Sequence, residues 1–235
     1  NNNWQNTIES LNSWPIDSRL SQRSFFKRHV SSFTTKKQRL FVIISDGLRY
    51  ENGVELSKRL LSENRYESSI EPMVTGLPSY TQLGMAALLP YHKLEFKDKS
   101  DTVLVDGLSS IGIPGRAKIL NQNSGVKAIA ILARDFMKMN AATEGRAFVK
   151  DHELIYIYHN RIDDTGDDTT SEEKVFDSVE EELTYLMDMI KKISNMNGIN
   201  IMITSDHGYI YQHHDLDESE FSKSKHKGEA WKENR

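Results

Sequence analysis

The sequence contains no cysteine among its 235 residues. This absence excludes disulfide bonds, thiolate zinc sites and a cysteine nucleophile, and it fits a reducing compartment. No apolar run approaches the roughly 20 residues that a membrane-spanning helix requires. The first ten residues, NNNWQNTIES, lack the charged and apolar regions of a signal peptide. We therefore expect a soluble cytoplasmic protein without membrane contact.

The chain has no excess of positive charge either, because 30 lysine and arginine residues stand against 34 acids, a net charge of −4. This balance excludes a protein that binds the polyanionic backbone of nucleic acid over its whole surface. One local stretch has seven basic residues and no acid: Arg19, Arg23, Lys27, Arg28, Lys36, Lys37 and Arg39. It is interpreted either as a solvated helix face with a linker or as a patch that contacts phosphates.

Short apolar runs that alternate with helix-like spacing define the fold class. The length suits one large α/β domain or one domain with an appendage. Strands are expected at 39–46, 101–107, 127–132, 154–158 and 199–206, and helices at 52–64, 81–90, 115–123, 134–151 and 171–198. Residues 4–33 are expected to be helical, 31–38 to form a polar connector and 66–80 to be extended. This alternation predicts an α/β fold with a mostly parallel sheet and helices on both faces.

Acidic residues follow three of the expected strands. They are Asp46, Asp163 and Asp206, and His207 comes directly after the last. A single such aspartate is explained by turn formation or helix capping. In parallel sheets, however, ligands bind beyond the carboxyl ends of the strands. Carboxylates with an imidazole and no thiolate favour zinc, manganese or a related divalent ion at a catalytic site.

Thr81 lies where an extended segment turns into a helix. A threonine there serves as an N-cap, or as a nucleophile whose hydroxyl is activated by a metal. Spacing alone does not favour Thr81 over Ser79 or Thr75. His159, shortly before Asp163, is interpreted equally as a support for a ligand or as part of the packing.

Four segments in this order resemble the alkaline phosphatase superfamily, and more closely the PglZ domain of BREX phage-defence systems. They are FVIISDGLRYE, LPSYTQLGMAALLP, YIYHNRIDDTGD and ITSDHGYIYQ, and the resemblance covers about residues 39–215. It implies an alkaline-phosphatase-like fold and a metal-dependent phosphoric ester hydrolase, either a phosphatase or a phosphodiesterase or nuclease. It also implies association with other BREX proteins, such as the methyltransferase PglX and BrxB.

The resemblance assigns roles to individual residues. Asp46, Asp206 and His207 match the ligands of one metal, and the stretch Pro78 to Thr81 matches the segment that ends in the nucleophile, which selects Thr81. Asp163 and Asp167 match ligands of a second metal. Asp167 stands where phosphodiesterase-like relatives have histidine, which makes this site richer in oxygen. Two divalent ions are implied, with zinc as the first choice and manganese or magnesium as alternatives.

In the mechanism that this assignment implies, Thr81 attacks phosphorus with the help of the first ion. Water then hydrolyses the phosphothreonine with the help of the second. The superfamily takes a further histidine for the second metal from well beyond the Asp-His-Gly segment. His213, His214 and His226 do not match it, so the second site lacks a ligand.

The resemblance divides the chain into a helical lead-in and linker (1–38), a core (39–215) and a polar extension (216–235) that leads into a missing remainder. The chain is thus expected to be an N-terminal portion of a longer core. The main alternative is a scaffold or interaction module that keeps the fold without turnover. A metal-dependent sugar-phosphate mutase shares the same motifs. A Rossmann-type dinucleotide binder is excluded, because no G-x-G-x-x-G follows the first strand.

Overall fold

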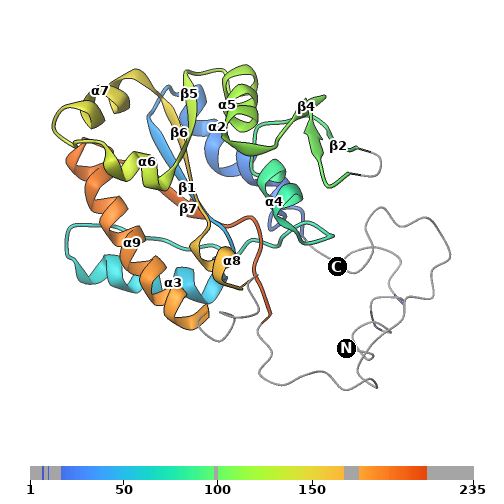
Figure 1. Ribbon diagram of the computed structural model, residues 1–235, viewed down its shortest axis with the longest axis horizontal. Coiled ribbons are helices and arrows are strands. Elements are labelled where there is room, and N and C mark those ends of the chain that lie inside the picture. Colours follow the sequence, from blue (N-terminus) through green and yellow to red (C-terminus); the bar gives the residue numbers. More distant parts are fainter. Residues whose placement is uncertain (1–6, 8–9, 11–16, 98–99, 167–174, 211–235) are drawn as a thin grey trace.

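A computed structural model describes residues 7, 10, 17–97, 100–166 and 175–210. Its larger sheet has four parallel strands in the order β5-β6-β1-β7. The strands are β1 (Leu40–Ser45), β5 (Ala128–Leu132), β6 (Leu154–His159) and β7 (Ile201–Thr204). Each lies within or overlaps a segment for which the sequence predicts a strand. The α/β class with a mostly parallel sheet is therefore confirmed (Figure 1).

Strand β1 occupies the middle of this sheet, and all six of its residues are buried. Its side chains alternate between the two faces: Leu40, Val42 and Ile44 pack in one apolar cluster, and Phe41 and Ile43 in the other. A continuous apolar run is the pattern of a strand covered on both sides. The central position places the carboxyl end of β1 between the carboxyl ends of β6 and β7.

Helices cover both faces of the sheet. The described helical segments are η1 (Gln22–Ser24), η2 (Phe26–Val30), α2 (Ser31–Thr35), α3 (Tyr50–Ser62), α4 (Thr81–Ala87), α5 (Gly112–Asn123), α6 (Ala133–Lys138), α7 (Glu144–Asp151), α8 (Arg161–Gly166) and α9 (Val175–Asn195). Residues of α3, α6, α7 and α9 share one apolar cluster, and residues of η2, α4 and α5 share the other. In Figure 1, α3 and α9 run side by side below the sheet. No helix among the described residues has the length and apolar character needed to cross a membrane.

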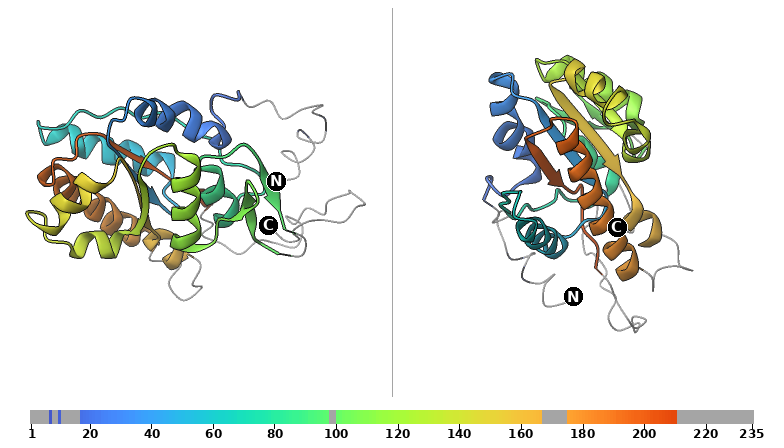
Figure 2. Two further views of the ribbon diagram at one scale, coloured as in Figure 1. Left: turned by 90° about the horizontal axis from the view of Figure 1, so that it is seen from above. Right: turned by 90° about the vertical axis from the view of Figure 1, so that its left-hand side faces the viewer.

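A small antiparallel sheet, absent from the expectations except for its central strand, packs against α4 and α5. Its strands are β2 (Leu94–Phe96), β3 (Val103–Val105) and β4 (Leu108–Ser109). Asp106 and Gly107 join β3 to β4 with φ values of 49° and 80°, as a two-residue Asp-Gly hairpin requires. Figures 1 and 2 place this sheet at the opposite end of the molecule from α7.

The helix expected at 134–151 is wrong as a single element, because α6 and α7 are separate. The side-chain oxygen of Asn140 accepts hydrogen bonds from the backbone N–H groups of Ala142 and Thr143, at 3.0 and 3.2 Å. The carboxylate of Glu144 accepts one from the N–H of Asn140 at 3.2 Å. Asparagine offers the backbone a local alternative to the helix, and here it forms a turn that precedes the start of α7 at Glu144.

The described part of the lead-in belongs to the core. Gln22 and Val30 are fully buried and Phe25 is 5% exposed, and Phe25 and Val30 join the cluster on the α4 side of the sheet. The connector expected at 31–38 contains α2, so it is partly helical. The division of the chain at residues 38 and 215 stays a prediction, and residues 211–235 lie outside the described part.

Candidate active site

The first candidate ligand lies in the turn after β1. The N–H of Asp46 donates to the carbonyl oxygen of His159 at 2.8 Å, which extends the ladder between β1 and β6 by one step. Gly47 follows with φ +76°, a conformation that glycine adopts without steric cost. The chain therefore turns sharply away and leaves the carboxylate of Asp46, 4% exposed, at the edge of the sheet.

Asp206 and His207 follow β7. Asp206 is fully buried, and the hydroxyl of Ser205 donates to the carbonyl oxygen of His207 at 2.6 Å, which fixes the loop. The side-chain amide of Gln22 donates to the carbonyl oxygen of Asp206 and, at 3.4 Å, to that of Ser205. A residue of the lead-in therefore holds the loop that carries two candidate ligands.

Thr81 is the first residue of α4, and Tyr80 occupies the N-cap position. One helical turn later, Gly84 lies against the main chain of Asp206. A Cβ added to Gly84 would lie 2.8 Å from the Cβ of Asp206, closer than two carbon atoms pack. The absence of a side chain at position 84 thus allows α4 to bring Thr81 to the end of β7.

The side chains converge on one nitrogen atom. His207 Nε2 lies 3.0 Å from Thr81 Oγ1, 3.4 Å from Asp46 Oδ1 and 3.5 Å from Asp206 Oδ2. One ligand atom each from Asp46, Asp206 and His207 lie within 4.8 Å of one another. Segments far apart in the sequence therefore place two carboxylates, an imidazole and a hydroxyl together.

These groups have the character of a cation site. Asp46 Oδ1 and both carboxylate oxygens of Asp206 are buried, and none accepts a hydrogen bond of ordinary geometry from the described residues. Burial, followed by the neighbouring charge of Asp206, raises the pKa of Asp46, and burial raises the pKa of Asp206. Two buried carboxylates in contact are costly unless a cation balances them. The donor set of oxygen and imidazole fits zinc or manganese.

Asp163 joins this group from a helix and not from a strand end. It lies in the first turn of α8, and its Oδ1 is 3.7 Å from His207 Nε2, with 24% of the side chain exposed. Asp167, predicted as its companion at a second metal, lies outside the described residues, as do His213, His214 and His226. The described residues therefore show one cluster, with Asp163 on its more exposed side.

A cavity of about 320 Å³ opens beside the cluster. Arg49, Thr75, Ser205 and His207 contribute to its lining. The guanidinium carbon of Arg49 lies 4.5 Å from the centre of the Tyr209 ring, and the same guanidinium pairs with Glu51. The cavity is large enough to hold a small ester next to His207.

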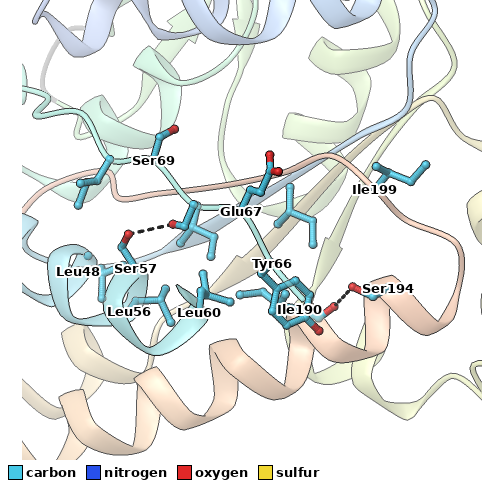
Figure 3. A pocket seen from close by; sticks show the side chains of 15 residues that line it. Leu48, Leu56, Ser57, Leu60, Tyr66, Glu67, Ser69, Ile190, Ser194 and Ile199 are labelled. Atoms are coloured by element: carbon cyan, nitrogen blue, oxygen red, sulfur yellow. Dashed lines mark hydrogen bonds between the residues drawn. The ribbon is translucent and has the colours of Figure 1, made fainter. Parts of the chain in front are cut away.

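A second hollow of about 280 Å³ lies between α3, α9 and β7, and its mixed lining includes Leu56, Leu60, Ile190 and Ile199 together with several serines. Figure 3 shows these side chains around it. Ser57 and Ser68, which also line it, are hydrogen-bonded to each other at 2.9 Å. No group with catalytic chemistry from the candidate cluster lines it. It adjoins the cavity beside His207, with which it shares Leu48, Gly53, Ile70 and Ile203.

The basic stretch is partly engaged within the protein. Arg19 pairs with Asp17 at 2.6 Å, Arg28 approaches Glu71 at 3.6 Å, and Arg39 donates to the carbonyl oxygen of His152 at 2.9 Å. For these three residues, the contacts favour the interpretation as a solvated helix face with a linker over a patch that contacts phosphates.

Sequence reasoning missed Gln22 and Gly84. Nothing close to either residue in sequence indicates that it contacts Asp206, because both contacts arise from the packing of distant segments. The small-residue character of the helix after Thr81 is the one signal that bears on Gly84. The motifs themselves pointed to the residues that the structure brings together.

The α/β fold gathers two carboxylates and an imidazole at the carboxyl ends of parallel strands, which is consistent with the alkaline-phosphatase-like class of proteins. The chain belongs to the family described as the BREX system PglZ alkaline phosphatase-like domain, which it matches over residues 25–235. The resemblance seen in the sequence is thereby confirmed.

Two relatives illustrate this membership. The chain is 40% identical over 217 residues to the alkaline phosphatase-like protein BrxZ of Escherichia coli O9:H4 (strain HS), an alignment that covers 89% of this chain and 25% of the relative. It is 37% identical over 220 residues to the alkaline phosphatase-like protein PglZ of Bacillus cereus (strain H3081.97), covering 92% of this chain and 25% of the relative. The chain thus spans about a quarter of the length of these relatives.

Proposed function

We propose that the chain carries the catalytic site of a metal-dependent phosphoric ester hydrolase that serves a BREX defence system, with Thr81 as the nucleophile. The observation that carries the proposal is the position of Thr81 Oγ1, 3.0 Å from His207 Nε2 and beside two buried carboxylates. A threonine that served only to begin α4 would have no need of this neighbourhood. Family membership supports the same reaction class.

Asp46, Asp206 and His207 would hold a divalent ion, and Asp163 would complete its surroundings or, with Asp167, hold a second. When bound, such an ion lowers the pKa of a nearby hydroxyl and offsets the charge of the phosphate group. Thr81 Oγ1 would attack phosphorus and displace the ester oxygen, giving a phosphothreonine that water then hydrolyses. The cavity beside His207 has the volume for a small ester; of the proposed site residues, His207 lines it and Thr81 does not.

The chemistry of the site fits both mono- and diesters. Two parts of the proposal rest on family membership alone. One is the hydrolysis of nucleic acid, and the other is assembly with PglX, BrxB or other BREX proteins. The alternative is a protein that keeps this fold and site but does not hydrolyse phosphate esters.

The test is hydrolysis of p-nitrophenyl phosphate and bis(p-nitrophenyl) phosphate by purified protein, stripped of metal and then supplied with zinc, manganese or magnesium. We expect turnover that depends on the added ion. Thr81→Ala should lower kcat by at least about a thousandfold, as loss of a nucleophile does, and Thr81→Ser should retain part of the activity. Ser79→Ala, an exposed hydroxyl two residues away, is the control. Turnover that survives Thr81→Ala unchanged contradicts the nucleophile, and no turnover with any ion favours the scaffold.

A further inference from the structure

Glu182 is a buried carboxylate that the proposed reaction does not use. It lies on α9, is fully buried, and contacts side chains from two neighbouring strands. Its Oε1 accepts a hydrogen bond from Ser45 Oγ at 2.7 Å, and its Oε2 lies 2.6 Å from His159 Nδ1. A fully buried glutamate is rare unless it is paired; this one accepts a hydrogen bond at Oε1 and has His159 Nδ1 close to Oε2, without the geometry of a hydrogen bond.

The two partners of Glu182 are the last residues of β1 and β6. Ser45 and His159 face each other in the register of these parallel strands. Asp46 follows Ser45 directly, and Asp163 stands in the helix that begins two residues after His159. Glu182 therefore connects the two strand ends from which these carboxylates of the candidate site emerge.

The ring of His159 is held from a second side. Tyr185 stacks on it, with ring centroids 4.6 Å apart and an interplanar angle of 18°. Because Glu182 and Tyr185 are three residues apart on α9, they lie on the same helix face. Helix α9 thus presents an acid and an aromatic ring to the imidazole of His159. These two contacts restrict the movement of that imidazole.

We infer that Glu182 is a positioning residue that fixes the spacing between Asp46 and Asp163. This inference rests on the proposed function, because the spacing matters only if the carboxylates hold a cation. Groups that orient metal ligands without touching the metal commonly change affinity by about 10–100-fold when they are removed. Stability alone explains Glu182 poorly, because replacing buried polar contacts by apolar side chains of similar volume is often neutral or stabilising.

The test is a titration of metal-free protein with cobalt(II), whose visible absorption reports coordination geometry. Glu182→Gln keeps the shape of the side chain and an acceptor for Ser45, but it removes the charge beside His159. We expect the affinity for cobalt(II) to fall by about tenfold or more and the absorption spectrum to change. The matched control is Glu180→Gln, because Glu180 lies two residues away on α9 and its exposed side chain pairs with Arg59 of α3. This control should bind cobalt(II) as the parent does.

A purely structural role predicts a different result. In that case Glu182→Gln lowers the melting temperature, but well below the transition the affinity and the spectrum match those of the parent, and the inference is overturned. Should Glu182→Gln fail to fold, Ser45→Ala removes the other contact of the same carboxylate and is expected to weaken cobalt(II) binding, whereas unchanged binding overturns the inference. If the parent itself binds no cobalt(II), the proposed function fails and Glu182 has nothing to position.

Discussion

Gly84 in helix α4 lies directly against the main chain of Asp206, although 122 positions separate them in the sequence. A Cβ at position 84 would lie 2.8 Å from both the carbonyl carbon and the Cβ of Asp206. Neither of these atoms is the end of a flexible side chain. The contact therefore sets the distance between the helix that carries Thr81 and the loop that carries His207.

Gly84→Ala is expected to move α4 and the loop apart. Forcing a methyl group into a closely packed site costs about 1–3 kcal/mol, and separation of Thr81 from His207 should remove hydrolysis of aryl phosphates. Thermal melting and turnover are the measurements. Gly53→Ala is the control for thermal melting only, because its Cβ would meet only the tip of the partly exposed Ile70, at 3.1 Å, whereas Gly53 itself lines the cavity beside His207. A Gly84→Ala protein as stable and active as the parent would show that the helix and the loop tolerate a wider separation.

Asp163 and Asp164 offer a comparison within one helix. Asp163 Oδ1 lies 3.7 Å from His207 Nε2, whereas the side chain of Asp164 is exposed. We expect Asp163→Asn to lower metal-dependent turnover by at least about tenfold and Asp164→Asn to leave it unchanged. Steady-state kinetics over a range of metal concentrations measures both. Equal effects of the two substitutions would remove Asp163 from the site.

Asp46→Asn should stabilise the metal-free protein. The raised pKa of Asp46 means that the folded chain keeps a proton that the unfolded chain releases above its ordinary value of 3.8. The free energy of unfolding of the parent therefore falls as pH rises above that value. Asparagine carries no charge, so the advantage of the variant should grow from about pH 5 to about pH 8, roughly the range in which proteins are most stable.

Melting temperatures of the metal-free parent and variant at the two ends of this range test the expectation. A gain of about 1 kcal/mol corresponds to about 2–4 °C at this chain length. Added zinc should raise the melting temperature of the parent and not that of the variant, because ions that bind the folded state stabilise it. The surface substitution Asp151→Asn is the control. A variant that melts below the parent at the higher pH would mean that Asp46 stabilises the fold without a cation.

The sequence predicts the residues of the site better than the contacts that hold them. The apolar runs of β1 and β7 are easy to recognise, so the sequence predicts that Asp46, Asp206 and His207 follow strands. Because parallel strands end at one edge of a sheet, these residues are expected to lie close together. Asp163 was expected at a strand end and lies in a helix, since β6 ends earlier, at His159. Asp163 still lies close to His207, because α8 begins at the same edge of the sheet.

What could not be predicted depends on distant packing or on very short elements. The contacts of Glu182 with Ser45 and His159 arise from the docking of α9, which no local pattern specifies. Strands of two or three residues, such as β4 and β2, are too short to show periodicity. The Asp-Gly pair at 106–107 was the available signal for that hairpin.

The amide of Gln22 reaches the carbonyl oxygens of Ser205 and Asp206, and its own side-chain oxygen accepts a hydrogen bond from the N–H of Gly76 at 3.3 Å. One residue near the start of the described chain thus ties together the approach to Thr81 and the segment that bears His207. A shortened version that began at residue 39, where the recognisable motifs start, would lose this tie. We therefore expect a fragment that begins at residue 39 to lose a contact that holds together two segments of the candidate site.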